Sequence, residues 1–368
     1  MIRLASKLTT IVKSYGACLT PAFFVSHSPE PSELFKDRDT VIQTGVLHPD
    51  VLAKHLRGIS LNGADGEALK ELQVRRVLKH HPGKRCTLEI ALRTEHGWHL
   101  LIAKVYRKDR SDVFAAMKGI QQAGFGPQDK FSISQPVAYA PSLRCLLQEK
   151  VEGTPADEIF RTGDEMTRAA TAERCARWLA QFHALAPGAG PVSHPRDFVH
   201  SKAMQRWSRK IANLEGCFGE KATHLLHRVE DASASLYDVE LRAGHGSYNA
   251  AHVYLSKDRT VTIDWDWHDV ADPARDVARF LYALRRWALD QLGSISALDK
   301  AADVFLKTYI AEGSPEVEKN LHFFEATTCL NLAVRHLFDE GPSWNEKQEK
   351  AEMMLDEGLR IVERGITS

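Results

Sequence analysis

The chain has 368 residues, with 48 basic and 48 acidic side chains, so its formal net charge is zero. This length allows a large buried core in one two-lobed unit or in two domains. The balanced charge gives no sign of a nucleic-acid partner, and the absence of an apolar run of about 18 residues argues against a membrane-spanning helix.

Two features bear on the location of the protein. The six cysteines are scattered and form no Cys-x-x-Cys pair, which favours reduced thiols in a cytoplasmic protein. Residues 1–29 contain three basic residues and no acidic residue, which is typical of a transit peptide and equally of a disordered terminus. We therefore predict a cytoplasmic protein in which residues 1–60 form a partly disordered extension, with one short helix at 51–57.

The segment from residue 72 to residue 106 predicts three antiparallel strands. Pro82-Gly83 marks the first turn and His96-Gly97 the second. Apolar side chains alternate along the last two strands, at Cys86, Leu88, Ile90, Leu92, Leu100, Ile102 and Val105. Residues 111–123 have the spacing of a helix, and residues 143–160 predict a strand, a linker and a helix.

Most of the remaining chain has helical periodicity. The predicted helices lie at 165–186, 201–242, 276–292, 298–312, 316–338 and 347–364. Gly153 and Pro155 mark a natural boundary, so we predict an N-terminal lobe at 61–152 and a helical lobe at 153–368. From Asp290 to the end, 15 acidic residues face 8 basic ones, which could receive a cationic small molecule or could be a solvated helical face.

The stretch from His245 to Asp276 interrupts this helical pattern. It predicts a tight loop, then a hairpin of residues 253–255 against 261–263, and then an acidic loop. Carboxylates and amides at strand ends can converge on one point, so such a stretch suits a site for a metal ion and a phosphate group.

The motifs in this stretch resemble those of the aminoglycoside phosphotransferase family, a branch of the protein-kinase-like fold. The family pattern is H-G-D with Asn five residues later, then I-D-[WF]-[DE], then D-P-x-x-D. His245-Gly246, Ile263–Asp266 and the segment Asp272–Asp276 match, whereas Ser247 takes the place of the catalytic Asp and His252 that of the metal-binding Asn. The resemblance covers roughly residues 70 to 340. It implies a two-lobed α+β fold with a small antiparallel N-lobe and a larger, mainly helical C-lobe.

The resemblance also implies a nucleotide site for ATP. Lys104 occupies the place of the strand lysine that pairs with the α- and β-phosphates. The helix at 111–123 has no Glu to hold this lysine, although Asp112 could substitute, and the glycine-rich cover loop is reduced to Gly83 beside Lys84 and Arg85. The adenine ring would bind backbone groups of a hinge formed by Gln148, Glu149 and Lys150.

The metal and catalytic positions follow from the same motifs. Asp264 stands 17 residues after Ser247 and would be the main Mg²⁺ ligand, with Asp266 and His252 as further candidates. A serine hydroxyl cannot accept a proton near neutral pH without a neighbouring base. Three hypotheses stay open: another group (His245, His252 or Asp266) accepts the proton, the protein binds nucleotide without turnover as a pseudokinase, or Ser247 is itself phosphorylated.

The function that these motifs favour is ATP-dependent phosphorylation of a hydroxyl group on a small molecule, with ATP and Mg²⁺ as cofactors. The acceptor stays open between aminoglycosides, sugars, choline, homoserine and similar metabolites. The oligomeric state also stays open.

Overall fold

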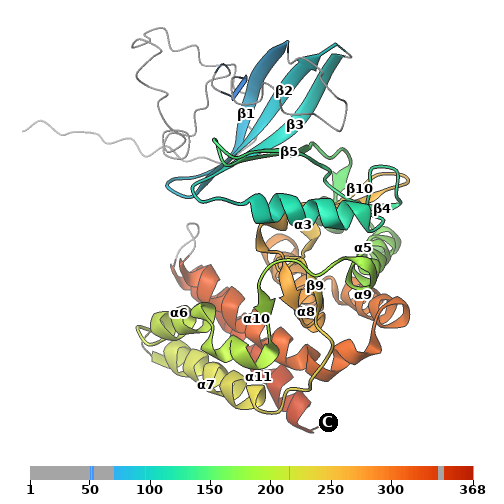
Figure 1. The fold of residues 1–368 in the computed structure, drawn as a ribbon. Coiled ribbons are helices and arrows are strands. Elements are labelled where there is room, and N and C mark those ends of the chain that lie inside the picture. Colours follow the sequence, from blue (N-terminus) through green and yellow to red (C-terminus); the bar gives the residue numbers. More distant parts are fainter. Residues whose placement is uncertain are drawn as a thin grey trace, which may run out of the picture.

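The computed structural model describes residues 50, 52–53, 70–95, 97–214, 216–338 and 344–367, which form two lobes (Figure 1). Residues 50, 52 and 53 are helical, and the rest of the predicted extension at 1–60 and of the predicted helix at 51–57 lies outside the described residues. A sheet forms the upper lobe in Figure 1, and helices form most of the lower lobe. The predicted α+β architecture is therefore confirmed.

The upper lobe is built on a five-stranded antiparallel sheet with the strand order β1-β2-β3-β6-β5. Its strands are β1 (Glu71–His81), β2 (Arg85–Thr94), β3 (Gly97–Tyr106), β5 (Pro136–Ala140) and β6 (Cys145–Glu149). The predicted first turn is present, and Gly83 adopts the left-handed conformation there (φ +68°), which glycine tolerates without strain. His96, in the predicted second turn, lies outside the described residues.

The two faces of this sheet have different partners. One face buries the alternating apolar residues of β2 together with Leu101, Ala103 and Val105 of β3. Because side chains alternate along a strand, Ile102 and Lys104 point to the other face, which looks toward the lower lobe. Helix α3 (Ser111–Gln122) follows β3 and lies across the junction of the two lobes (Figure 1).

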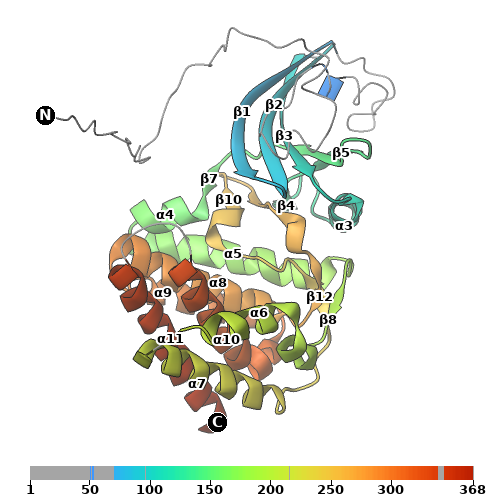
Figure 2. The ribbon, with the colours of Figure 1, turned by 90° about the vertical axis from the view of Figure 1, so that its left-hand side faces the viewer.

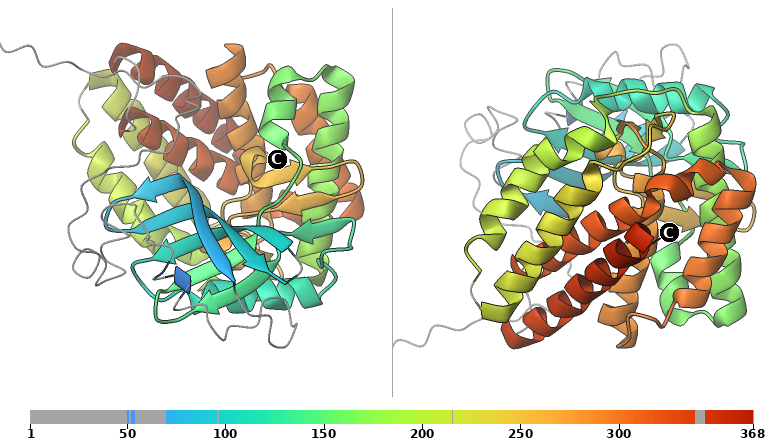
Figure 3. Two further views of the ribbon diagram at one scale, coloured as in Figure 1. Left: turned by 90° about the horizontal axis from the view of Figure 1, so that it is seen from above. Right: turned by 90° about the horizontal axis from the view of Figure 1, so that it is seen from below.

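The lower lobe is mainly helical, as Figures 2 and 3 show from the side and from below. Its helices are α4 (Ala156–Thr162), α5 (Glu165–Leu185), α6 (Lys202–Ile211), α7 (Gly216–Ser233), α8 (Ala274–Leu292), α9 (Asp299–Glu312), α10 (Glu318–Phe338) and α11 (Trp344–Thr367). Helix α5 packs on α9, and α10 packs on α7, α8 and α11. Trp178 and Phe182 of α5 stack on each other at 5.2 Å and lie in the middle of this core.

Short strands place the loops of the lower lobe next to the upper lobe. They are β4 (Phe131–Ile133), β7 (Thr154–Pro155), β8 (Val192–Ser193), β9 (Arg242–Gly244), β10 (Val253–Leu255), β11 (Thr260–Thr262) and β12 (Asp269–Ala271). Strands β10 and β11 form the predicted hairpin, and β9 pairs with β12. The loop after β9 carries Ser247 and the loop after β11 carries Asp264, so both predicted site loops meet where the lobes join.

Candidate active site

A cleft of about 450 Å³ lies between the two lobes. Strands β1, β2 and β3 provide one wall, the β6 end provides the back, and β10 with the residues after β11 provides the other wall. Of the predicted site residues, the cleft is lined by Lys104, Gln148, Glu149, Lys150, His252 and Asp264. The structure therefore brings six predicted residues from four separate segments around one space.

Lys104 is the buried cation of this cleft. Its Nζ lies 2.7 Å from Asp264 Oδ1 and 3.1 Å from Asp266 Oδ1, although the chain separates these residues by about 160 positions. Burial lowers the pKa of Lys104, and the charge of Asp264 opposes that shift. The side chain is held by opposite charge rather than by solvent.

Asp264 faces the cleft in an unusual backbone conformation. Its φ is +68°, in the left-handed region that non-glycine residues rarely adopt outside functional sites. Burial alone would raise the pKa of Asp264, but Lys104, His252 and Arg85 hold it well below its usual range. The carboxylate is therefore ionised at neutral pH and able to hold a cation.

Asp266 connects the lobes and does not line the cleft. Its Oδ1 accepts hydrogen bonds from Lys104 and, at 2.8 Å, from the Tyr106 hydroxyl, and its Oδ2 pairs with Arg85. The Asp266 carbonyl accepts a further bond from Arg110 at 2.7 Å. Four residues of the upper lobe thus converge on one residue of the lower lobe, and both carboxylate oxygens are already bonded.

These contacts explain how Lys104 is held although α3 has no glutamate. Asp112, the predicted substitute, pairs with Arg110 at 3.0 Å instead of with Lys104. Asp266 supplies the second carboxylate to Lys104 in its place. Sequence reasoning identified Lys104, Arg85 and Asp266 separately but missed their contacts, because no local pattern indicates that residues so far apart in the chain will pair.

Asp276 holds the loop that carries Ser247 in place. The Asp276 carboxylate accepts hydrogen bonds from the amides of His245, at 2.6 Å, and Gly246, at 3.0 Å. Gly246 has φ +73°, and a Cβ there would lie 2.0 Å from the carbonyl oxygen of Trp267. Only glycine fits, so the two site loops pack directly on each other.

His245 is fully buried and has a defined hydrogen-bonding pattern. Its Nε2 lies 3.0 Å from the Ile263 carbonyl, which can only accept, so Nε2 carries the proton. Nδ1 is then an acceptor, and the Ser247 amide nitrogen and the Ser247 hydroxyl oxygen each lie 3.3 Å from it. Burial lowers the pKa of His245, so the imidazole is neutral. The Ser247 hydroxyl therefore has a neighbouring base, His245, which was one of the three candidates predicted from the sequence.

His252 lies between the loop that carries Ser247 and Asp264. Its Nδ1 is 3.0 Å from the Ser247 carbonyl and 3.0 Å from Asn249 Nδ2, while its Nε2 is 3.6 Å from Asp264 Oδ2. Burial lowers the pKa of His252 to about 4, so this imidazole is also neutral at physiological pH. It presents a nitrogen, not an oxygen, to the space beside Asp264.

The three predicted hinge residues differ in which of their groups remain available to a ligand. The Glu149 amide is bonded to the Gln135 carbonyl at 2.8 Å, and the Lys150 ammonium pairs with Glu89 at 3.1 Å. Gln148 is buried at the back of the cleft. The Glu149 carboxylate accepts the Gln135 amide at 3.1 Å, so the side chains of Glu149 and Lys150 stabilise the hinge. A ring bound in the cleft would contact backbone atoms beside them.

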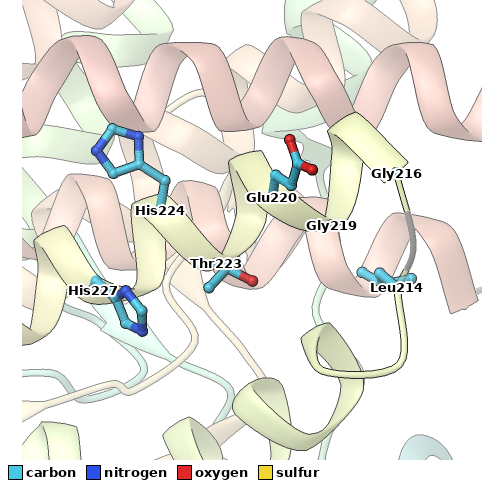
Figure 4. A pocket seen from close by; sticks show the side chains of 7 residues that line it. All are labelled: Leu214, Gly216, Gly219, Glu220, Thr223, His224 and His227. Carbon is cyan, nitrogen blue, oxygen red and sulfur yellow. The ribbon is translucent and has the colours of Figure 1, made fainter.

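A second hollow lies along α7 in the lower lobe. It is lined by Leu214, Gly216, Gly219, Glu220, Thr223, His224 and His227. Figure 4 shows that the His224 and His227 side chains extend to different sides of the helix, so the two imidazoles do not share a ligand. Within the described residues, no three His, Cys, Asp or Glu side chains converge as a metal site, and no helix has the length and apolar character needed to cross a bilayer.

A lysine on the third strand, a hinge and an acidic loop around an interlobe cleft define a protein-kinase-like fold. The sequence of residues 64–299, more than half of the chain, matches the phosphotransferase enzyme family. The chain belongs to this APH family, which confirms the resemblance seen in the motifs. Comparison with curated proteins gave no match.

Solved structures support the fold at low sequence identity. A choline/ethanolamine kinase family protein from Mesorhizobium loti has a TM-score of 0.58 and 14% identity, covering 87% of this chain and 99% of that one. Choline kinase from Cryptosporidium parvum Iowa II has a TM-score of 0.54 and 9% identity, covering 86% and 96%. A variant of the aminoglycoside phosphotransferase APH(4)-Ia, solved with AMP-PNP and hygromycin B, has a TM-score of 0.54 and 14% identity, covering 85% and 98%.

Proposed function

We propose that this protein transfers the γ-phosphoryl group of ATP to a hydroxyl group of a small molecule. The observation that carries this proposal is the contact between Lys104 Nζ and Asp264 Oδ1, 2.7 Å apart in a cleft that the hinge closes at the back. Phosphoryl transfer depends on positioning and on neutralising phosphate charge, and this pair supplies a cation and a metal-binding anion at one point. The APH(4)-Ia complex, which holds AMP-PNP together with the small molecule hygromycin B, supports the proposal.

The residues present fit one Mg²⁺ ion bound together with a nucleotide. Mg²⁺ prefers oxygen ligands and is commonly bound by one or two carboxylates plus substrate phosphates. Asp264 is ionised and faces the cleft, whereas Asp266 is already bonded through both oxygens and His252 offers a nitrogen, which suits softer metals. Asp264 would therefore hold the ion, which neutralises phosphate charge when bound. Asp266 and His252, the other two predicted metal ligands, would contribute little to binding the ion.

In this proposal Ser247 orients the acceptor hydroxyl and passes its proton to His245. His245 Nδ1 accepts the Ser247 amide N–H and lies 3.3 Å from the Ser247 hydroxyl, and a hydroxyl that donates to this nitrogen keeps its lone pairs for a bond from the acceptor. Of the three predicted bases, His252 points its free nitrogen toward Asp264, and Asp266 is saturated by Lys104, Tyr106 and Arg85. Of these bases, His245 contacts the Ser247 hydroxyl, and such general-base assistance contributes about 10²–10⁴-fold.

The test is a phosphotransfer screen with matched variants. Purified protein is incubated with ATP, Mg²⁺ and panels of hydroxyl compounds, and phosphorylated products are detected by mass spectrometry. Lys104→Ala and Asp264→Ala should abolish product formation. The control is Lys300→Ala, because Lys300 is exposed on α9, pairs with Glu165 and does not line the cleft. Turnover that persists in Lys104→Ala or Asp264→Ala would show that these residues do not form the active site.

A second candidate function is nucleotide binding without turnover. It is favoured by the uncharged Ser247 at the position of the catalytic acid and by the neutral imidazole of His252 beside Asp264. In that case nucleotides stabilise the protein but no acceptor in the screen is phosphorylated. Introducing Ser247→Asp with His252→Asn would then create or raise phosphotransfer, provided that the loop held by Asp276 keeps its geometry.

A further inference from the structure

Gln148 carries a buried carboxamide at the back of the cleft. This residue of β6 lines the cleft and is only 4% exposed. Among the residues that the structure describes, none forms a hydrogen bond with its carboxamide. A buried amide without a hydrogen bond costs free energy, so native proteins pair such groups within the chain, with ordered water or with a ligand.

The two other buried carboxamides in the described part of the chain are paired within the protein. Gln135 donates to two backbone carbonyls, at 2.7 and 3.0 Å, and accepts from Gln121 at 2.6 Å. Asn320 accepts from the Tyr237 amide at 3.0 Å and donates to the Tyr237 carbonyl at 2.9 Å. Of these three buried carboxamides, only that of Gln148 borders the cleft, so its partner would come from a bound molecule.

The pairing of the strands places Gln148 on the same side of the sheet as Lys104. Gln148 lies directly opposite Ile102 of β3, and directly opposed residues of an antiparallel pair point to the same face. Lys104 is two positions further along β3 and shares this face. With a rise of about 3.3 Å per residue, the two rows lie about 7 Å apart along the sheet. A ligand held by Lys104 can therefore extend to Gln148.

The cleft around this carboxamide is lined by apolar side chains from both lobes. Ile102 lies on the upper wall and Ile263, which follows β11, on the lower wall. The nearest charged groups of the hinge are engaged, since the Lys150 ammonium pairs with Glu89 at 3.1 Å. An apolar cleft with a few polar groups binds a ligand and fixes its orientation. These surroundings suit a flat, neutral ring whose polar edge meets Gln148.

We propose that the Gln148 side chain recognises the base of the nucleotide and selects adenine over guanine. This inference rests on the proposed nucleotide-dependent phosphotransfer, and it adds a side chain to the backbone groups of the hinge. A carboxamide offers a donor and an acceptor side by side, which match N7 and the N6 amino group of adenine. Guanine presents two acceptors, O6 and N7, at the same edge, so the Gln148 carbonyl oxygen would stay unpaired.

The experiment measures nucleotide binding without an acceptor, so that its result does not depend on turnover. The Kd values of ATP, GTP and 7-deaza-ATP, in which a carbon replaces N7, are measured by calorimetry with Mg²⁺. The proteins are the wild type, Gln148→Met and the control Gln73→Met. Gln73 lies on β1 of the same sheet, donates to Glu71 at 2.7 Å and does not line the cleft.

We expect the wild type to bind ATP at least about fivefold more tightly than GTP, as a two-bond contact between a carboxamide and adenine predicts. ATP should also bind at least about twofold more tightly than 7-deaza-ATP, which lacks one of the two bonds. Gln148→Met should remove both preferences, and Gln73→Met should keep them. Equal affinity of the wild type for ATP and GTP, or for ATP and 7-deaza-ATP, would overturn the inference, as would preferences that persist in Gln148→Met.

The stability of the free protein distinguishes base recognition from a structural role of this side chain. Gln148→Met keeps the size of the side chain and removes a carboxamide without partners, so the unfolding temperature should be unchanged or higher. Gln135→Met removes existing hydrogen bonds and should lower it. A fall in Gln148→Met equal to that in Gln135→Met would contradict the inference.

Failure of the proposed function would give a different result. Binding with the expected preferences but without phosphorylation of any acceptor would contradict the phosphotransfer alone. Binding of nucleotides without preference for adenine, together with phosphorylation of an acceptor, would contradict the role of Gln148 alone. Absence of binding by all three nucleotides would contradict both.

Discussion

Replacing the carboxylate of Asp266 tests the link between the two lobes. Asp266 is only 7% exposed and bonds Lys104, Arg85 and Tyr106 of the upper lobe. Asp266→Asn keeps the shape of the side chain but removes its charge, so Arg85 loses its main partner while Lys104 keeps Asp264. Removing one member of a buried ion pair costs about 3–5 kcal/mol. We expect the lower end, about 3 kcal/mol, because Arg85 is partly exposed and Lys104 stays paired.

The assay is urea unfolding in a double-mutant cycle with Arg85→Met. If the two side chains act through their mutual contact, the double variant should be less destabilised than the sum of the single variants, with a coupling free energy of at least about 1 kcal/mol. A thermal scan of Asp266→Asn should show a fall of about 6 °C, at about 2 °C per kcal/mol for a chain of this size. Additive effects within about 0.5 kcal/mol would refute the lobe-connecting role of Asp266.

Three further predictions concern the loop that carries Ser247. The double variant Ser247→Asp with His252→Asn should raise the phosphotransfer rate by about 10²-fold or more, and an unchanged rate would contradict the role given to Ser247. Gly246→Ala should destabilise the protein by several kcal/mol and abolish activity, because the new Cβ meets the Trp267 carbonyl at a positive φ; urea unfolding with near-normal stability would contradict this packing. The pKa of His252 is about 4 in the folded protein, against an ordinary value of 6.5. Between these pH values the unfolded chain binds a proton that the folded protein does not bind. The free energy of unfolding should therefore fall as the pH drops from about 6.5 to about 4, by about 3 kcal/mol from this residue. Unfolding of His252→Asn over that pH range should lack this part of the slope, and an identical slope in both proteins would show that His252 is not buried in its neutral form.

The sequence was sufficient for the parts of the site that lie within one continuous motif. The hairpin between residues 253 and 262, the position of Asp264 after it, and the position of Lys104 on the third strand follow from alternation, turn residues and motif spacing. These features are local, since a strand or hairpin pattern is written in neighbouring residues. The overall α+β division followed in the same way from the change between two-residue and helical periodicity.

The contacts that the sequence could not predict join distant segments. Asp266 was a candidate metal ligand by motif, and only the approach of β2 and β3 shows that Arg85, Lys104 and Tyr106 occupy its oxygens. The unprotonated state of His245 Nδ1 depends on the Ile263 carbonyl, which comes from the next loop and accepts the proton on Nε2. The acidic excess of the C-terminal region left open a cationic ligand or a solvated helical face, because net charge along a chain does not specify which side chains face a site.

The most direct test of the nucleotide site is a thermal-unfolding titration with ATP, with and without Mg²⁺, in the wild type and in Asp264→Ala. At a nucleotide concentration about 100 times Kd, ligand binding to the folded state adds about 3 kcal/mol of stability, or about 5 °C for a chain of this size. We predict a Mg²⁺-dependent rise of this order in the wild type and in Lys300→Ala, and its loss in Asp264→Ala. No rise with any nucleotide in the wild type, or an equal rise in Asp264→Ala, would contradict the nucleotide site built on Lys104 and Asp264.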